Sequence, residues 1–209
     1  MFNLMPEQVV VVTDTLAMNT EHQPYLLVSK CAVVPHLNTV IAGTGAGQLG
    51  SRWVQFVSER MACLDVDMLD AHAPLGISRL WDELQAEHGG FEGTSTIYHF
   101  GRSEDEQRYV GYAYRSTNGF ASESLGYGFG VKPPPEGGFD PSLDVRSLEE
   151  WIKLAVQIRG EEDLKPLPDR IHIGGALVCV MLQGGTITVS EIFRFDDFGA
   201  MWSELNTRL

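Results

Sequence analysis

Short apolar runs separated by polar turns make up much of the chain. Runs of this kind are typical of β-strands, because a helix instead repeats its apolar positions about every 3.6 residues. The last two runs flank Gln183-Gly184-Gly185, a sequence that favours a hairpin turn. The predicted strands are residues 9–12, 25–34, 39–43, 94–100, 108–115, 173–182 and 186–193.

Four other segments carry apolar residues at spacings of three and four, which place them on one face of a helix. The second helix is predicted to begin near Pro74 and to end at Gly89-Gly90, and Asp196-Asp197 are expected to cap the last helix. We expect all four tryptophans to be packing residues. The predicted faces are Leu49, Trp53, Phe56, Val57 and Met61; Ile77, Leu80, Trp81 and Leu84; Leu148, Trp151, Ile152 and Ala155; and Phe198, Met201, Trp202 and Leu205.

The order of these elements is strands, two helices, strands, helix, hairpin and helix. Consecutive strands joined by short connections predict antiparallel pairing and an α+β fold. The chain shows no internal repeat and no composition shift that would mark a boundary, and residues 132–140 form an expected exposed loop. We therefore expect a single domain over residues 1–209.

The formal net charge of −13 makes nucleic acid an unfavourable partner. No apolar run is long enough to cross a bilayer, and the initial MFNLMPEQ lacks the features of a secretion signal. The cysteines, Cys31, Cys63 and Cys179, are widely separated and show no zinc spacing. These observations predict a cytoplasmic protein with reduced thiols and no membrane association.

Gly45, Gly47 and Gly50 form a G-x-G-x-x-G pattern between a predicted strand and a predicted helix. This pattern can hold the pyrophosphate of a dinucleotide, and Asp65 and Asp67 follow about twenty residues later, where a ribose-binding carboxylate would lie. A dinucleotide domain, however, requires strands that alternate with helices. The other interpretation is that these glycines allow a sharp strand-to-helix turn that packs closely on the sheet.

Five short segments occur in a particular order: residues 9–15 (VVVVTDT), 29–33 (SKCAV), 43–47 (GTGAG), 124–128 (SLGYG) and 173–176 (IGGA). Taken together, they resemble the proteasome β-subunit family, including its bacterial relatives that partner an unfolding ATPase. The resemblance covers nearly the whole chain. It implies a four-layer αββα sandwich, two antiparallel sheets between helix layers, as in N-terminal-nucleophile hydrolases.

The resemblance also implies a catalytic site. In the family a threonine at the mature N-terminus attacks an amide carbonyl, its own α-amine acts as base, and a lysine and an aspartate tune the proton transfers. Lys30 and Asp14 match the lysine and the aspartate. The expected lining of the substrate cleft is Thr13, Thr15, Gly45, Ala46, Gly47, Tyr127 and Ile173.

The nucleophile does not match. The family places a whole strand, beginning with the threonine, before the strand that ends in Asp14, and residues 1–8 are expected to be too few for that strand and its turn. Met1, Phe2 and Asn3 offer no hydroxyl or thiol, and the sequence begins at a methionine, so no removed propeptide is expected.

Three further positions depart from the family pattern. Tyr127 and Ile173 replace serines, and Arg170 occupies the position expected for an aspartate, which lies one place earlier as Asp169. Together with the missing nucleophile, these departures predict that the peptidase chemistry is lost. Lys30 and Asp14 would then be either catalytic relics or a structural ion pair.

The leading hypothesis is therefore a proteasome-like protein without peptidase activity that acts through self-assembly or by binding a protein partner. A homo-oligomer is expected, with no cofactor. The alternatives are an amidohydrolase or threonine-type peptidase of the same fold with an unrecognised or processed nucleophile, and a dinucleotide-binding protein that uses Gly45, Gly47 and Gly50. No metal site is expected, because the acidic cluster in the predicted loop after the first helix, Asp65, Asp67, Asp70 and His72, lacks the ligand pattern of a calcium loop.

Overall fold

The computed structural model describes residues 1–90, 93–138 and 146–207. Within these ranges it contains four α-helices and three sheets, and the strands pair antiparallel throughout. The prediction of an α+β fold with antiparallel sheets is confirmed.

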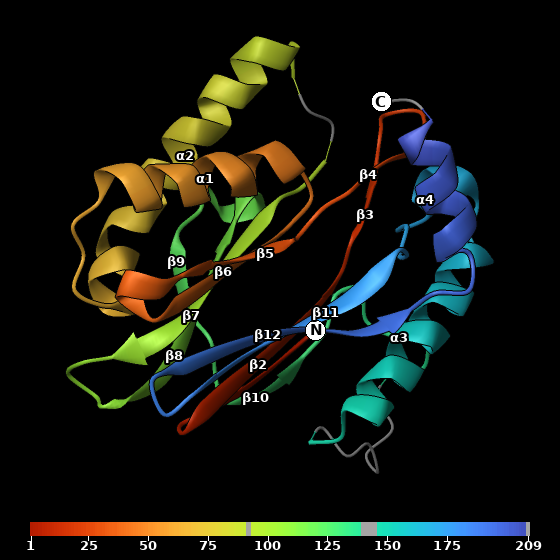
Figure 1. The fold of residues 1–209 in the computed structure, drawn as a ribbon. Helices are drawn as coiled ribbons and strands as arrows, with labels where there is room; N and C mark the ends of the chain where they lie inside the picture. The colour runs from red at the N-terminus through yellow and green to blue at the C-terminus, as the bar shows by residue number, and fades with distance from the viewer. Residues whose placement is uncertain (91–92, 139–145, 208–209) are drawn as a thin grey trace.

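The first five-stranded sheet combines the two ends of the chain (Figure 1). Its central strand is β2 (Gln8–Asp14), whose valines 9–12 are all buried. The C-terminal hairpin turns through Gly184 and Gly185, which both have positive φ angles that suit glycine. The strand order is β10 (Gly128–Gly130), β1 (Phe2–Met5), β2, β11 (Ala176–Gln183) and β12 (Thr186–Arg194).

The second five-stranded sheet consists of the middle of the chain, in the order β5 (Cys31–Val34), β6 (Thr39–Thr44), β7 (Thr96–Ser103), β8 (Arg108–Arg115) and β9 (Ser122–Ser124). A separate pair contains β3 (Leu16–Met18) and β4 (Pro24–Leu27). The prediction of one strand over 25–34 was wrong. The chain leaves β4 at Val28, whose N–H donates to the Thr15 carbonyl at 2.7 Å, and it enters the other sheet at Cys31.

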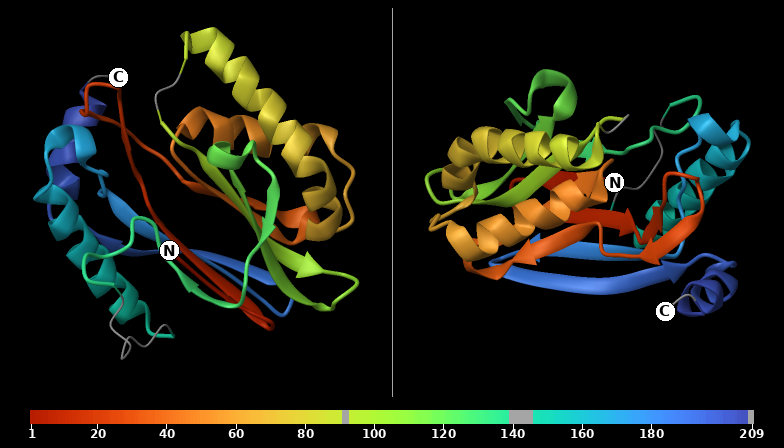
Figure 2. Two further views of the ribbon diagram at one scale, coloured as in Figure 1. Left: turned by 180° about the vertical axis from the view of Figure 1, so that it is seen from behind. Right: turned by 90° about the horizontal axis from the view of Figure 1, so that it is seen from above.

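The helices lie in two pairs on opposite sides of the molecule, α1 (Gly47–Arg60) with α2 (Val66–His88), and α3 (Leu148–Asp163) with α4 (Phe198–Asn206) (Figures 1 and 2). The predicted start of α2 near Pro74 was wrong, and Pro74 lies inside the helix. The earlier start follows from the Asp65 side chain, which caps the Met68 N–H at 2.9 Å. Short 3₁₀ turns occur at Pro35–Leu37, Ser116–Asn118 and Leu167–Asp169.

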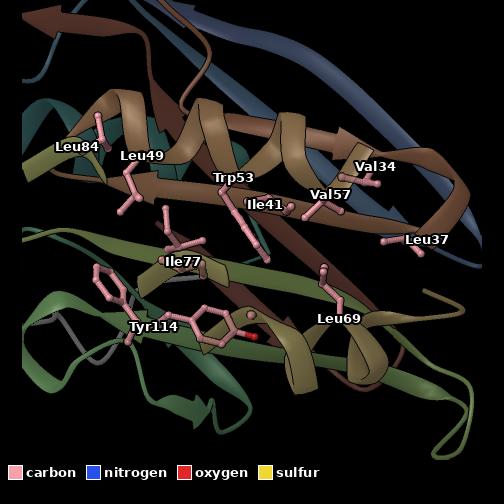
Figure 3. Close-up of a cluster of buried hydrophobic side chains, with 13 residues drawn as sticks. Val34, Leu37, Ile41, Leu49, Trp53, Val57, Leu69, Ile77, Leu84 and Tyr114 are labelled. Atoms are coloured by element: carbon pink, nitrogen blue, oxygen red, sulfur yellow. The ribbon is translucent and has the colours of Figure 1, made fainter. Parts of the chain in front are cut away.

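One core lies between α1, α2 and the second sheet (Figure 3). Trp53 of α1 is fully buried, and its indole N–H donates to Nε2 of the equally buried His99 of β7 at 2.7 Å. Gly76 of α2 lies so close that an added Cβ would be 2.6 Å from the Trp53 ring. The tight packing of α1 against α2 therefore depends on the large Trp53 ring lying opposite Gly76, which has no side chain.

A second core contains residues from both five-stranded sheets, and a third joins the first sheet to α3. The strand β2 contributes to both because its side chains alternate: Val9 and Val11 belong to the second core, and Val10 and Val12 belong to the third. The first sheet is therefore covered by the second sheet on one face and by α3 on the other. This two-sided burial explains the unbroken valine run.

The C-terminal helix differs from its prediction in two respects. Trp202 is 53% exposed, so it is not the core residue that its spacing predicted. Asp197 makes no capping bond with its side chain, because its carboxylate instead pairs with the Arg159 guanidinium at 2.6 Å. In the described residues, none of the helices has the length and apolar character needed to cross a membrane.

Candidate functional site

The first strand brings the start of the chain beside the Lys30–Asp14 pair. The strand β1 pairs antiparallel with β2, and Pro6-Glu7 form the turn between them. The expectation that residues 1–8 are too few for a strand and a turn was wrong, because a two-residue turn suffices for an antiparallel hairpin. We call Met1, Asp14 and Lys30 the hairpin site.

The hairpin site holds two amines around one carboxylate. The α-amine of Met1 donates to the Val12 carbonyl at 2.8 Å, and Lys30 Nζ lies 2.8 Å from an oxygen of Asp14. Burial lowers the pKa of the Met1 α-amine to about 6, against the opposing field of Asp14. The structure therefore brings Lys30 and Asp14 into contact, near an amine whose pKa of about 6 leaves it largely neutral at pH 7.

Asp14 is also fixed by the backbone. Its second carboxylate oxygen accepts from the N–H groups of Leu16 and Gly174, both at 3.2 Å. Gly174 belongs to the segment before β11, so the carboxylate links three parts of the chain. Within the described residues, Asp14 is the side chain that bonds Lys30 Nζ.

The hydroxyls and the thiol next to Asp14 and Lys30 in the sequence have other partners. Thr13 Oγ1 lies 3.7 Å from Cys31 Sγ, Thr15 Oγ1 accepts from the Ala176 N–H at 2.9 Å, and Ser29 Oγ donates to the Cys31 carbonyl. Burial raises the pKa of the Cys31 thiol, which makes it a poor nucleophile at neutral pH. The contacts of these four residues are those of packing residues.

The glycine turn follows β6 directly. Gly45 has a φ of +91°, and an added Cβ would be 2.7 Å from Ser95 Oγ, whose oxygen accepts the Ala46 N–H at 2.9 Å. An added Cβ on Gly47 would meet nothing within 4 Å. The strand β6 pairs antiparallel with both of its neighbours, β5 and β7, so the turn after β6 lacks the parallel strand–helix–strand context of a dinucleotide site.

Tyr127 lies toward the other end of the β1–β2 hairpin. Its hydroxyl donates to the Tyr109 carbonyl at 3.1 Å, and the Tyr109 N–H donates to the Pro6 carbonyl in the hairpin turn. Because Gly128 pairs with Leu4, Tyr127 and Met1 are separated by about 13 Å of strand. The structure does not bring Tyr127 to Lys30.

The remaining expected residues lie before β11. Ile173 packs against the core between α3 and the first sheet, directly before the Gly174 that bonds Asp14. Arg170 donates to the carbonyls of Asp163 and Lys165 at 2.7 Å and 3.1 Å, so its guanidinium holds the end of α3. Asp169 lies in the preceding 3₁₀ turn.

A shallow pocket of about 280 Å³ lies beside the glycine turn. We call it the Lys132 pocket, and its lining residues are Thr44, Gly45, Thr94, Lys132, Pro133 and Ile171. Two observations connect it to the hairpin site. The Gly43 N–H donates to the Lys30 carbonyl at 3.0 Å, and Gly130 pairs with Phe2, so Lys132 follows at the Met1 end of β1. Of the expected cleft residues, the pocket includes Gly45.

Sequence reasoning missed Lys132 and Thr44. Lys132 lies in a proline-rich segment that resembles a solvated loop, and no spacing connects it to residues of the second sheet. The Met1 amine was missed for a similar reason, since a two-residue Pro-Glu turn is a weak hairpin signal.

The acidic cluster connects α2 to the second sheet and does not form a loop. Asp67 accepts from the Tyr112 hydroxyl at 2.6 Å, and Asp70 accepts from the Tyr114 hydroxyl at 2.7 Å. Asp65 caps the helix, so the prediction that this cluster lies in a loop was wrong. Within residues 1–90, 93–138 and 146–207, no group of three or more His, Cys, Asp or Glu is arranged to hold a metal ion.

The comparison with known proteins gives no relative: the sequence matches none of the protein-family models, and no curated protein is significantly similar to it.

Proposed function

We propose that this chain is a proteasome-like protein of the N-terminal-nucleophile hydrolase fold whose peptidase chemistry is lost, and that it acts by binding and self-association. The observation that carries this proposal is the set of contacts around Lys30 and Asp14. Thr13, Thr15 and Cys31 make packing contacts, and burial raises the pKa of the Cys31 thiol, so none of these three residues offers the pair an activated hydroxyl or thiol.

The arrangement of the sheets supports the fold part of the proposal. One five-stranded sheet packs against the other, α3 covers the free face of the first, and α1 and α2 cover the free face of the second. This packing is what a four-layer αββα sandwich requires. A lysine and an aspartate beside the start of the first strand fit the same interpretation.

Peptide hydrolysis is the direct test of lost chemistry. We expect purified protein to cleave none of a panel of fluorogenic peptides and amides, and we expect Lys30→Ala to give the same background. Turnover by the wild type that Lys30→Ala abolishes would show that the inherited site is active and would overturn this part of the proposal.

Binding is supported by exposed apolar side chains at one corner of the molecule. Trp202 of α4 is 53% exposed, Tyr25 and Leu26 of β4 are 58% and 42% exposed, and α4 packs beside β4 (Figure 1). A contiguous patch of exposed apolar side chains commonly marks an interaction surface. We propose a homo-oligomer that uses this corner.

Native mass spectrometry tests the oligomer. We expect a species larger than the monomer at micromolar concentration, and we expect Trp202→Ser to shift the population toward monomer. Val189→Ser, which removes a side chain 57% exposed on β12, is the matched control and should leave the population unchanged. Monomer alone across the concentration range would refute self-association.

A further inference from the structure

His22 and His172 are 150 residues apart in the chain, and their imidazole rings are in contact. Nδ1 of His22 lies 3.3 Å from Nε2 of His172, and the ring centroids are 5.5 Å apart. The second distance exceeds the first by about the width of one ring, so the two nitrogens point at each other. Such a contact is a hydrogen bond when one nitrogen carries a proton and the other accepts it. We call the two rings the histidine pair.

His172 lies on a segment that is fixed to the body of the protein. On one side of it, the Ile171 N–H donates to the Glu162 carboxylate at 2.8 Å, and the Arg170 guanidinium donates to carbonyls at the end of α3. On the other side, Ile173 packs against the core between α3 and the first sheet. The His172 ring is therefore the stationary member of the pair.

His22 lies in the tip of the β3–β4 hairpin, residues 19–23, and this hairpin extends away from the two large sheets beside α4 (Figure 1). The Asn19 side chain accepts from the N–H groups of Glu21 and Gln23 at 3.0 Å and 2.9 Å. The His22 N–H donates to the Asn19 carbonyl at 3.2 Å, and the turn holds His22 at a left-handed φ of +57°. Among the described residues, the hydrogen bonds of the tip close within the tip, apart from the one at the His22 ring. The histidine pair is therefore the hydrogen bond that ties the tip to the rest of the protein.

The histidine pair can hold one added proton but not two. With one added proton, an imidazolium donates to a neutral imidazole, and this charge-assisted hydrogen bond is stronger than the neutral one. With two, both facing nitrogens carry hydrogen, so neither can accept, and two positive charges lie at 3.3 Å. Histidine is the side chain whose ordinary pKa places this change between pH 5 and pH 8.

The charged groups near His172 do not compensate a second proton. Burial, the partner ring and Arg170 lower the pKa of His172. The fields of Asp163 and Glu162 raise it, but each carboxylate has a cation of its own. Glu162 pairs with Lys165 at 2.6 Å, and Asp163 lies 3.6 Å from the Arg170 guanidinium.

Three further acids lie on the segments that flank the pair. They are Glu21 of the tip, Asp169 of the 3₁₀ turn before His172, and Glu204 of α4, which packs beside β4. All three are exposed, so water and salt screen their fields. Near the pair, the described residues therefore offer a second proton no buried carboxylate that lacks a cation of its own.

We propose that the histidine pair is a pH switch, which holds the hairpin tip on the segment before β11 while it carries at most one added proton and releases the tip when both rings are charged. The tip is held at neutral pH and is released in mild acid. Because β4 carries Tyr25 and Leu26, release of the tip changes one edge of the proposed oligomer corner. The switch does not rest on self-association or on lost catalysis, and a monomer shows it equally.

A nuclear magnetic resonance titration of ¹⁵N-labelled full-length protein from pH 8 to pH 4.5 is the test. Ring nitrogen signals report the charge of each histidine. We expect the rings of His22 and His172 to titrate in two coupled steps, the second at a proton concentration at least about tenfold higher than the first. The ¹⁵N heteronuclear NOE of residues 19–23 reports motion on the ps–ns timescale and should fall with the second step. The indole N–H of Trp53, which donates to buried His99, should keep its signal because the core stays folded.

Two variants distinguish the switch from a contact that only packs. In His172→Gln the glutamine amide can still bond the His22 ring but gains no charge, so His22 should titrate in one step and the NOE of residues 19–23 should not depend on pH. His22→Asn should give the same result, because asparagine tolerates the left-handed φ of this position. His36→Gln, at an exposed position outside the pair, is the matched control and should titrate and release the tip as the wild type does.

The proposal is overturned if His22 and His172 each titrate in a single independent step, or if the tip NOE stays constant as both rings become charged. It is also overturned if the tip of folded His172→Gln loosens in acid as the wild-type tip does, because the second charge would then not be the cause. Monomer alone in the native mass spectrum would change none of these outcomes.

Discussion

Gly45 and Gly47 are two residues apart in one motif, but their surroundings differ. Gly45 has a left-handed φ of +91° and packs against Thr94 and Ser95, whereas Gly47 begins α1 with open space beside it. The G-x-G-x-x-G pattern is therefore explained at its first position by the strand-to-helix turn. No structural demand for glycine is found at Gly47.

We expect Gly45→Ala to lower the free energy of unfolding by about 3 kcal/mol, because it combines left-handed strain with overpacking against the Thr94 carbonyl. Gly47→Ala is the matched control and should change it by less than about 1 kcal/mol, in the stabilising direction. Urea unfolding of both variants measures the difference. Equal effects would show that the turn is not what requires Gly45.

Buried His99 makes stability depend on pH. Burial lowers its pKa from 6.5 to about 3, so below pH 6.5 the unfolded chain binds a proton that the folded chain excludes. The contribution of neutral His99 to the stability of the folded chain is complete above pH 6.5 and is lost as the pH falls toward 3. We expect His99 to account for about 2 kcal/mol of lost stability between pH 7 and pH 5.

The variant His99→Gln should remove that part of the pH dependence, since glutamine can still accept from the Trp53 indole. His72→Gln, at an exposed position of α2, should retain the wild-type slope. Urea unfolding of the wild type and of both variants at pH 7, 6 and 5 gives the slope of the free energy of unfolding against pH for each protein. A slope for His99→Gln identical to that of the wild type would contradict the assignment.

Among the elements, α2 departs furthest from its prediction. Its first two turns contain Asp67, Asp70 and His72, which resemble a polar loop, and Pro74 resembles a start signal. The structure makes these turns helical because Val66, Leu69 and Ala73 are fully buried and because the acids bond tyrosines of β8. Tertiary contacts therefore extended the helix beyond its local signals.

We expect Asp65→Ala to destabilise the protein by about 2 kcal/mol. The Asp65 carboxylate caps the Met68 N–H and also accepts from the Glu104 N–H at 3.0 Å, so both donors lose a partner. Asp65→Asn keeps one acceptor oxygen and should lose less than half as much. Thermal unfolding followed by circular dichroism compares the two, and equal losses would argue against the capping role.

At the scale of the molecule, Lys30 and Asp14 join the two large sheets. Asp14 ends β2 in the first sheet, and Lys30 directly precedes β5 in the second. Neither side chain is more than 26% exposed, so their attraction is only partly screened. The pair therefore stabilises the packing of the sheets whether or not it once served catalysis.

We expect Lys30→Met to lower the free energy of unfolding by about 1–3 kcal/mol, because the Asp14 carboxylate loses its counter-charge. Asp14→Ala should cost more, since the N–H groups of Leu16 and Gly174 lose their acceptor as well. A double-mutant cycle in urea should give a coupling of about 1 kcal/mol or more. A coupling near zero would show that the two charges act independently.

The sequence by itself determined most of the strands, the existence of the four helices and the α+β class, because alternating and 3.6-residue apolar patterns are local and each demands a buried face. It also indicated Lys30 and Asp14 as partners through a resemblance. Only the tertiary structure decided the division of residues 25–34 between two sheets, the early start of α2 and the place of Met1 beside Lys30. The tertiary structure alone also brought Thr44 and Lys132 to the same pocket. Those features depend on contacts between residues far apart in the chain, which no local pattern specifies.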